Sequence, residues 1–256
     1  MRQTVPALIF LTILVVAAGL SNVSALDTPG SGTTEQKSSI MITGYQVSPE
    51  VLMHNDIGTV TVTVKNMELV NSVNIKEAQM LSQSVKVLSD YYLGIGRLGP
   101  GESLNLTFTL KAVCPDGIYY PRILVKGEDA QNIRYSIPVT VDSSSLTIGV
   151  KDIPEDIFTG ERAKIELVVG NPRQNTATGV KVVIENNTVV PSEVFIGELP
   201  ADAPEVASFN FTPQTTGAHI LNFGLEYKNG DNIHLTSLSV PLNVTESKKN
   251  AELILT

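Results

Sequence analysis

The 256-residue sequence contains no Trp, and aromatic residues make up only 5% of it. A sugar-binding platform of stacked indole rings is therefore not expected. Charged residues amount to 17%, below the usual value of about 25%. No cluster of Lys and Arg is present that could neutralise phosphates, so nucleic acid is not expected as a partner. The net charge of −8 indicates a soluble, self-repelling chain.

Cysteine is also scarce, because Cys114 is the only one. A single thiol cannot form an intramolecular disulfide, so packing alone must hold the fold together. Two interpretations of Cys114 stay open. It is either a small buried apolar residue or a free thiol that pairs with another chain.

Sequence motifs for catalysis are missing as well. There is no Gly-x-Ser-x-Gly, phosphate-binding loop, dinucleotide-binding glycine pattern or His-Glu-x-x-His. The three histidines, His54, His219 and His234, lack the spacing of metal ligands, and a zinc site needs three or four convergent side chains. We therefore expect no enzyme activity, no cofactor and no small-molecule substrate.

The N-terminus reads as an export signal. Arg2 precedes an almost unbroken apolar run over residues 6–20, and Val23-Ser24-Ala25 fits the small-x-small cleavage pattern. The run is shorter than the roughly 20 residues that a membrane span needs. It predicts a signal peptide over residues 1–25, with an uncleaved anchor as the alternative. Residues 26–39 are polar and rich in Gly, Ser and Thr, which predicts a flexible linker.

From residue 40 onward, apolar residues alternate with polar ones. Val60, Val62 and Val64 alternate with threonines, and similar alternation recurs through the second half of the chain. Period-two patterning predicts half-buried β-strands. Residues 75–88 are the one segment that allows a helix, and we expect strand and loop there. Asn229-Gly230 predicts a hairpin turn.

The alternating pattern repeats after about one hundred residues. The strand pattern at residues 59–66 recurs at 163–171, and that at residues 136–141 recurs at 239–244. The sequence therefore predicts an all-β chain of two tandem immunoglobulin-like β-sandwich domains. Their expected bounds are residues 40–142 and 143–246, followed by a C-terminal tail over residues 247–256.

Three segments carry a family resemblance: GTVTVTVKN at residues 58–66, LGPGESLNLTFTL at 98–110 and PDGIYYPRILV at 115–125. They resemble the cell-adhesion-related immunoglobulin-like domains of bacteria and archaea, and similar domains associated with α-galactosidases. The secreted two-domain layout is similar to archaeal S-layer-domain-like proteins. The resemblance implies a spacer or adhesion role at the cell surface, in some relatives beside ABC-type exporters.

Three groups of residues are candidate sites. Four Asn-x-Thr sequons are candidate N-glycosylation sites, at Asn105, Asn186, Asn210 and Asn243. Carboxylates near the domain junction either offer oxygen ligands to Ca²⁺ or belong to a solvated loop that caps strand ends, at Asp142, Asp152, Glu155 and Asp156. The segment 66–92 is more apolar than a connecting loop requires, and its candidate contact residues are Met67, Leu69, Val70, Met80, Leu81, Tyr91 and Tyr92. The alternative is that most of these side chains complete the core of the first domain.

The expected function is that of a non-enzymatic structural or adhesion protein on the extracellular face of the cell envelope, with envelope or membrane proteins as partners. One alternative is an extracytoplasmic accessory subunit of an ABC-type transporter. In that reading the apolar residues 251–256 add as a strand to a partner sheet. A further alternative is a carbohydrate-binding module.

Overall fold

The computed structural model describes residues 40–128 and 130–247. The predicted signal peptide and linker lie outside the described residues, as does residue 248 to the end of the predicted tail. All of the described secondary structure is β-strand, which confirms the predicted all-β sandwich fold. The part of the chain that is described contains no helix long and apolar enough to cross a membrane.

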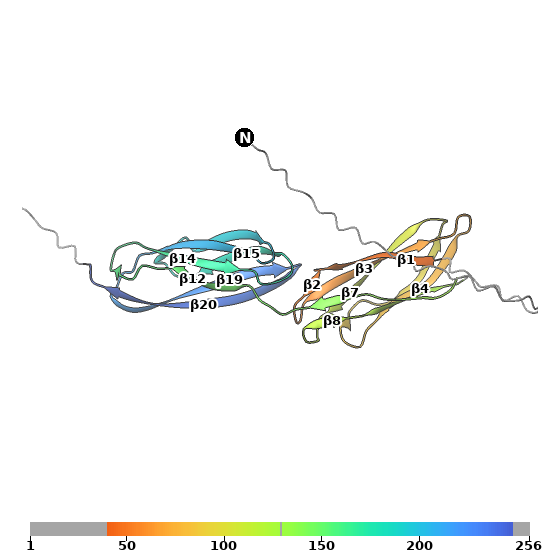
Figure 1. The fold of residues 1–256 in the computed structure, drawn as a ribbon, viewed down its shortest axis with the longest axis horizontal. Helices are drawn as coiled ribbons and strands as arrows, with labels where there is room; N and C mark the ends of the chain where they lie inside the picture. The colour runs from red at the N-terminus through yellow and green to blue at the C-terminus, as the bar shows by residue number, and fades with distance from the viewer. Residues whose placement is uncertain (1–39, 129, 248–256) are drawn as a thin grey trace, which may run out of the picture. The chain divides into compact units, whose positions relative to one another are not determined.

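The strands of residues 40–141 form a first sandwich (Figure 1). Its sheets have the orders β1-β3-β7-β5 and β10-β9-β4-β6, with a small third sheet β2-β11-β8. The strands are β1 (Ile40–Ser48), β2 (Val51–Leu52), β3 (Ile57–Asn66), β4 (Val73–Leu81), β5 (Lys86–Val87), β6 (Tyr92–Leu98), β7 (Ser103–Lys111), β8 (Gly117–Tyr119), β9 (Arg122–Gly127), β10 (Ile133–Ser136) and β11 (Val139–Val141). Residues 75–88 are therefore strand and loop, as expected.

The strands of residues 147–245 form a second sandwich, with sheets of order β12-β14-β18-β16 and β13-β20-β19-β15-β17. They are β12 (Thr147–Asp152), β13 (Ile157–Phe158), β14 (Ala163–Gly170), β15 (Ala177–Ile184), β16 (Val189–Val190), β17 (Glu193–Leu199), β18 (Pro204–Phe211), β19 (Gly217–Asn229) and β20 (Asn232–Thr245). The strand order of the first of these sheets, β12-β14-β18-β16, corresponds to β1-β3-β7-β5 of the first sandwich. The repeat in the sequence is thus also present in the strand order.

Each sandwich surrounds its own apolar core. In β3 the alternating valines Val60, Val62 and Val64 are almost fully buried, while the threonines between them face outward. Ile165, Leu167 and Val169 of β14 repeat this arrangement in the second core. Burying such a side chain contributes about 1.5–3 kcal/mol, so strand alternation is the main source of stability for a chain without disulfides.

One buried asparagine recurs at the same place in both sandwiches. Asn66 ends β3, and its amide group donates to the carbonyl oxygens of Asn71, Leu98 and Gly99 at 2.9–3.0 Å. Asn171 follows β14, and its amide group donates to the carbonyl oxygens of Asn175, Leu199 and Pro200 at the same range of distances. Carbonyl groups that fold away from water need hydrogen-bond partners. Each asparagine supplies them to two loops, whose carbonyl groups strand pairing does not reach.

The two sandwiches differ in the continuity of their last strands. In the second sandwich, β19 and β20 run without interruption and pair from Gly217↔Val244 to Asn229↔Asn232. In the first sandwich the matching strands are split into β8 and β9 at Pro121, and into β10 and β11 before Val139. Pro138 does not by itself account for the second break, because β20 runs through Pro241, which pairs with Ile220. Proline lacks the N–H that a ladder needs. The split leaves Tyr120 and Arg122 exposed at the break.

Candidate functional site

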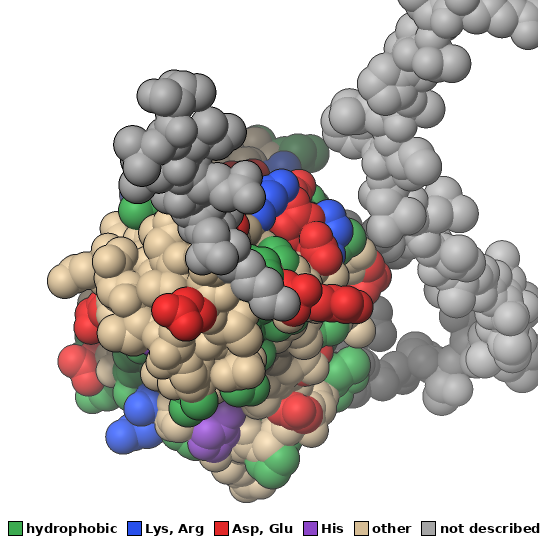
Figure 2. Space-filling model, turned by 90° about the vertical axis from the view of Figure 1, so that its left-hand side faces the viewer, with side chains coloured by type: hydrophobic (Ala, Val, Ile, Leu, Met, Phe, Trp, Pro, Cys, Tyr) green, Lys and Arg blue, Asp and Glu red, His purple; other side chains and the backbone are tan. Residues whose placement is uncertain are grey.

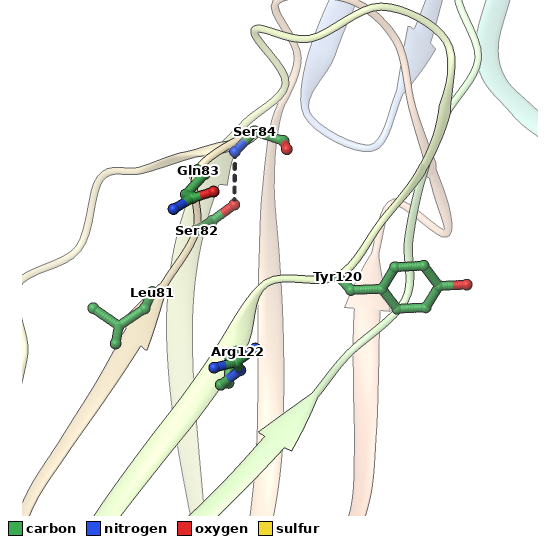
Figure 3. A pocket seen from close by; sticks show the side chains of 6 residues that line it. All are labelled: Leu81, Ser82, Gln83, Ser84, Tyr120 and Arg122. Carbon is green, nitrogen blue, oxygen red and sulfur yellow. Dashed lines mark hydrogen bonds between the residues drawn. The ribbon is translucent and has the colours of Figure 1, made fainter.

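The break beside Pro121 opens a hollow of about 530 Å³ in the first sandwich. It is lined by Leu81 at the end of β4, by Tyr120 and Arg122, and by the loop Ser82, Gln83 and Ser84. In Figure 3 the Tyr120 ring points away from Leu81, and the Ser84 amide donates to the Ser82 hydroxyl 3.2 Å away within the loop. The lining side chains therefore do not converge on one ligand position.

The predicted contact residues fall into two separate groups. Met67, Leu69 and Val70 lie between β3 and β4, and all three are exposed, Leu69 by 91%. Leu81, Tyr91 and Tyr92 lie at the opposite end of β4, because β6 pairs with β4 through Ala78↔Tyr92. A nine-residue strand spans about 30 Å, so the segment 66–92 does not form one contact surface. The inclusion of Met80 was wrong, because its side chain is buried in the core.

Tyr92 has a structural role that the sequence did not indicate. Its hydroxyl donates to the Thr107 carbonyl oxygen at 2.7 Å and accepts from the Thr107 amide at 3.3 Å. Its ring packs edge-on against Phe108, with 5.4 Å between ring centroids. The neighbour of β7 on that side is the two-residue β5, which pairs only with Leu110 and Lys111. Tyr92 thus caps an edge that short strand pairing leaves open.

A network of buried polar side chains joins the two sandwiches. Arg173, only 1% exposed, follows β14 of the second sandwich. Its guanidinium donates to the carbonyl oxygens of Ser144 at 2.6 Å, Asp142 at 3.0 Å and Val51 at 3.4 Å. Because the planar guanidinium presents several fixed donors, it connects the segment around Val51 with the chain between the sandwiches.

Asp56 of the first sandwich and Asn229 of the second form the other half of this junction. Asp56 is 2% exposed, and its carboxylate accepts from the Met53 amide at 2.9 Å and from the Asn229 amide group at 2.6 Å. The Asn229 amide group also donates to the Val51 carbonyl oxygen at 2.9 Å. A hydrogen-bonded carboxylate is tolerated in such a buried position.

Two further contacts extend the junction. Asn232 exchanges a pair of 2.9 Å hydrogen bonds with the backbone of Ile57. His234 Nε2 lies 2.9 Å from the Asp56 carboxylate, and the His234 ring stacks on Tyr227. Met53 packs in the core of the second sandwich although its sequence position is in the first. The boundary between residues 142 and 143 stays a prediction.

The hairpin predicted at Asn229-Gly230 is formed between β19 and β20, where Asn229 pairs with Asn232 and the two loop residues are Gly230 and Asp231. Only Gly230 of the two loop residues has a positive φ, +61°. A side chain there would lie 3.1 Å from the ring of Pro49, so close contact with the first sandwich reinforces the requirement for glycine. The sequence indicated a turn at Asn229, and the structure shows that its side chain enters the junction.

The carboxylates considered for Ca²⁺ do not gather into a site. Asp142 accepts hydrogen bonds from the Ser144 amide and hydroxyl, at 2.9 and 2.6 Å. These bonds, and more weakly the charge of Arg173, hold the pKa of Asp142 below its usual range. Within residues 40–128 and 130–247, no three His, Cys, Asp or Glu side chains are arranged to hold a metal ion.

His54 and His219 each contact a backbone carbonyl oxygen. His54 Nδ1 lies 3.3 Å from the Cys114 carbonyl oxygen, and His219 Nε2 lies 2.9 Å from the Thr215 carbonyl oxygen. Cys114 is buried in the first core, 6% exposed, which favours the interpretation as a small apolar residue. Figure 2 shows a face on which acidic and basic side chains are interspersed among hydrophobic side chains and other surface atoms.

Comparisons with known proteins give only distant structural likeness. No family model matches the sequence, and no curated protein matches it. The crystal structure of red sea bream transglutaminase covers 82% of this chain at 11% identity and a TM-score of 0.32. This chain spans 32% of that protein's length. The ASH/PapD-like domain 7 of human CEP192 covers 40% of this chain at 15% identity and a TM-score of 0.31, with 87% of that domain matched.

Proposed function

We propose that this chain is a non-enzymatic structural or adhesion protein of the cell surface, in which two β-sandwiches act as a spacer that presents protein-contact surfaces. The observation that carries the proposal is the buried junction formed by Arg173, Asp56 and Asn229. A spacer must hold its units in a fixed relation, and a flexible linker would not do so. Charged side chains that are buried and hydrogen-bonded at a junction restrict the ways in which two units can meet.

The surfaces that would contact partners lie on the first sandwich. Leu69 and Val70 are exposed by 91% and 81% at one end of β4, and Leu81 and Tyr120 are exposed at the other. Exposed apolar side chains grouped beside polar ones are typical of sites of protein contact. Envelope or membrane proteins are the proposed partners, and export through the predicted signal peptide is part of the proposal.

Purification of the native protein from cross-linked, detergent-solubilised envelopes tests this function. We expect mass spectrometry to recover wall or S-layer components with the chain. Recovery of a permease and its ATPase in a fixed ratio would instead support an accessory subunit of a transporter. An unpartnered protein in the medium would contradict both and leave a secreted binding module, which a polysaccharide-induced rise in melting temperature would reveal.

The fixed relation of the sandwiches has a separate test in NMR relaxation of the full chain. We expect amides of β7 and of β18 to report the same rotational correlation time in the wild type. A variant with Asp56→Ala and Asn229→Ala should give two different and shorter times. Independent tumbling already in the wild type would contradict the spacer proposal.

A further inference from the structure

Three of the four sequons have their asparagine in a paired strand. Asn210 of β18 pairs with Lys164 on one side and Val190 on the other. Asn243 of β20 pairs with Ala218 of β19. No hydrogen bond joins Asn210 to Thr212 or Asn243 to Thr245 among the described residues, and the Thr245 hydroxyl donates to the Ile157 carbonyl oxygen at 3.4 Å. Neither segment can leave its sheet without the loss of ladder hydrogen bonds.

The sequon in β7 is tied to the neighbouring strand. The Asn105 side-chain oxygen accepts from the Thr63 hydroxyl at 2.8 Å. The hydroxyl oxygens of Thr107 and Thr61 lie 2.9 Å apart. Each half of this sequon is thus bonded to β3, and Asn105 also pairs with Thr63 through the ladder.

Asn186 is in a different setting, in the loop between β15 and β16. The Val189 amide donates to the Asn186 carbonyl oxygen at 3.1 Å and closes a turn. The Asn186 side-chain oxygen accepts from the Thr188 amide at 2.9 Å and from the Thr188 hydroxyl at 2.6 Å. This is the local Asx geometry that asparagine favours in turns. The Asn186 side-chain amide and the Thr188 hydroxyl, which define the sequon, are therefore in contact within one loop.

The Asn186 amide nitrogen remains available in this arrangement. No hydrogen bond from this nitrogen is formed to any residue of the described ranges, since the side chain uses only its oxygen. The side chain is partly exposed, and its neighbours Glu185 and Asn187 are exposed. A modifying enzyme could reach the loop without opening a strand ladder.

A hollow of about 410 Å³ lies beside Asn186 on the outer face of the β20-β19-β15 sheet. Gly224 of β19 helps to form it, because a side chain there would come within 3.1 Å of Val183. Ile220, exposed by 63%, lies at the hollow with the polar side chains of Asn222 and Ser237. A sugar ring carries both C–H and hydroxyl groups, so this surface offers partners to each.

We propose that Asn186 is N-glycosylated in the folded protein and that Asn105, Asn210 and Asn243 are not. The donor is a lipid-linked glycosyl pyrophosphate. The Asn186 nitrogen forms a bond to the anomeric carbon as the bond from that carbon to the pyrophosphate oxygen breaks. The lipid pyrophosphate leaves with the electron pair, and one amide proton passes to a base of the transferase. In the cell the step rests on the export assumed under the proposed function, but the test below does not.

The test incubates the purified, folded full chain with a lipid-linked oligosaccharide and membranes that contain an oligosaccharyltransferase. Peptide mass spectrometry after enzymatic glycan release, which converts the modified Asn to Asp, maps the sites. We expect glycan at Asn186 alone. An unmodified Asn186, while a short reference peptide is glycosylated in the same mixture, would overturn the proposal. Equal modification of the strand sites would overturn it as well.

Variants and peptides separate the fold from the local sequence. Asn186→Gln and Thr188→Ala should abolish the modification, whereas Thr188→Ser and the matched control Asn187→Gln should retain it. Short peptides that carry each of the four sequons serve as the unfolded reference, and we expect them to accept glycan comparably. If only the Asn186 peptide is an acceptor, the fold has no part in the choice and the proposal fails.

Discussion

Replacement of Arg173 by methionine tests the junction directly. The guanidinium is almost completely buried and donates to the carbonyl oxygens of Ser144, Asp142 and Val51, at 2.6, 3.0 and 3.4 Å. Methionine keeps much of the apolar stem and removes every donor. The variant Arg173→Met therefore leaves the carbonyl groups at the junction without their partner, and changes the packing little.

The magnitude follows from two opposing contributions. The two shorter hydrogen bonds to a charged group are each worth about 1.5–3 kcal/mol, and the third is too long to add much. Removal of the charge recovers part of the cost of burying a cation, because Arg173 forms no ion pair within the described residues. We expect the free energy of unfolding to fall by about 2–3 kcal/mol. For a chain of this size the melting temperature should fall by about 4–12 °C.

Urea and thermal unfolding, followed by circular dichroism, measure the change. Arg162→Met is the matched control, because Arg162 is exposed and its loss should alter stability by no more than about 0.5 kcal/mol. Hydrogen exchange should accelerate most in β2, which pairs next to the junction. If Arg173→Met is no more destabilising than Arg162→Met, Arg173 does not hold the sandwiches together and the reasoning is refuted.

Three further predictions concern single side chains. Asn66→Ala should lower the free energy of unfolding by about 2–4 kcal/mol in urea titrations, because the buried carbonyl group of Leu98 and the partly buried ones of Asn71 and Gly99 lose their donor. A loss below about 0.5 kcal/mol would contradict the anchoring role. Tyr92→Phe should cost about 0.5–1.5 kcal/mol through the unpaired Thr107 backbone. The control Tyr91→Phe, at a residue 57% exposed, should have no effect, and equal effects would exclude an edge cap. The lowered pKa of Asp142 means that its carboxylate stabilises the fold fully above the usual aspartate pKa and loses this contribution as pH falls through the lower folded-state pKa. The stability difference between wild type and Asp142→Asn should shrink over that pH interval, and a pH-independent difference would refute the assignment.

The sequence by itself determined the fold class and the core of each sandwich. Alternation in a strand is a local property, because successive side chains point to opposite faces. Val60, Val62 and Val64 could thus be assigned to the core from their spacing alone, and the structure buries all three. Turn residues act locally too, so Asn229-Gly230 indicated the hairpin.

Only the tertiary structure decided the fate of polar side chains. Arg173 and Val51 are separated by 122 positions, and Asn229 and Asp56 by 173. No local pattern distinguishes these residues from exposed ones, since a charged side chain is buried only where distant carbonyl groups or donors meet it. The same limit applies to the sequons, because the Asn-x-Thr motif is the same at Asn105 and Asn186. Strand pairing holds Asn105 against β3, whereas the turn at Asn186 leaves its amide nitrogen accessible. Local periodicity sets which face of a strand is dry, whereas the pairing of remote segments sets which polar groups are left accessible.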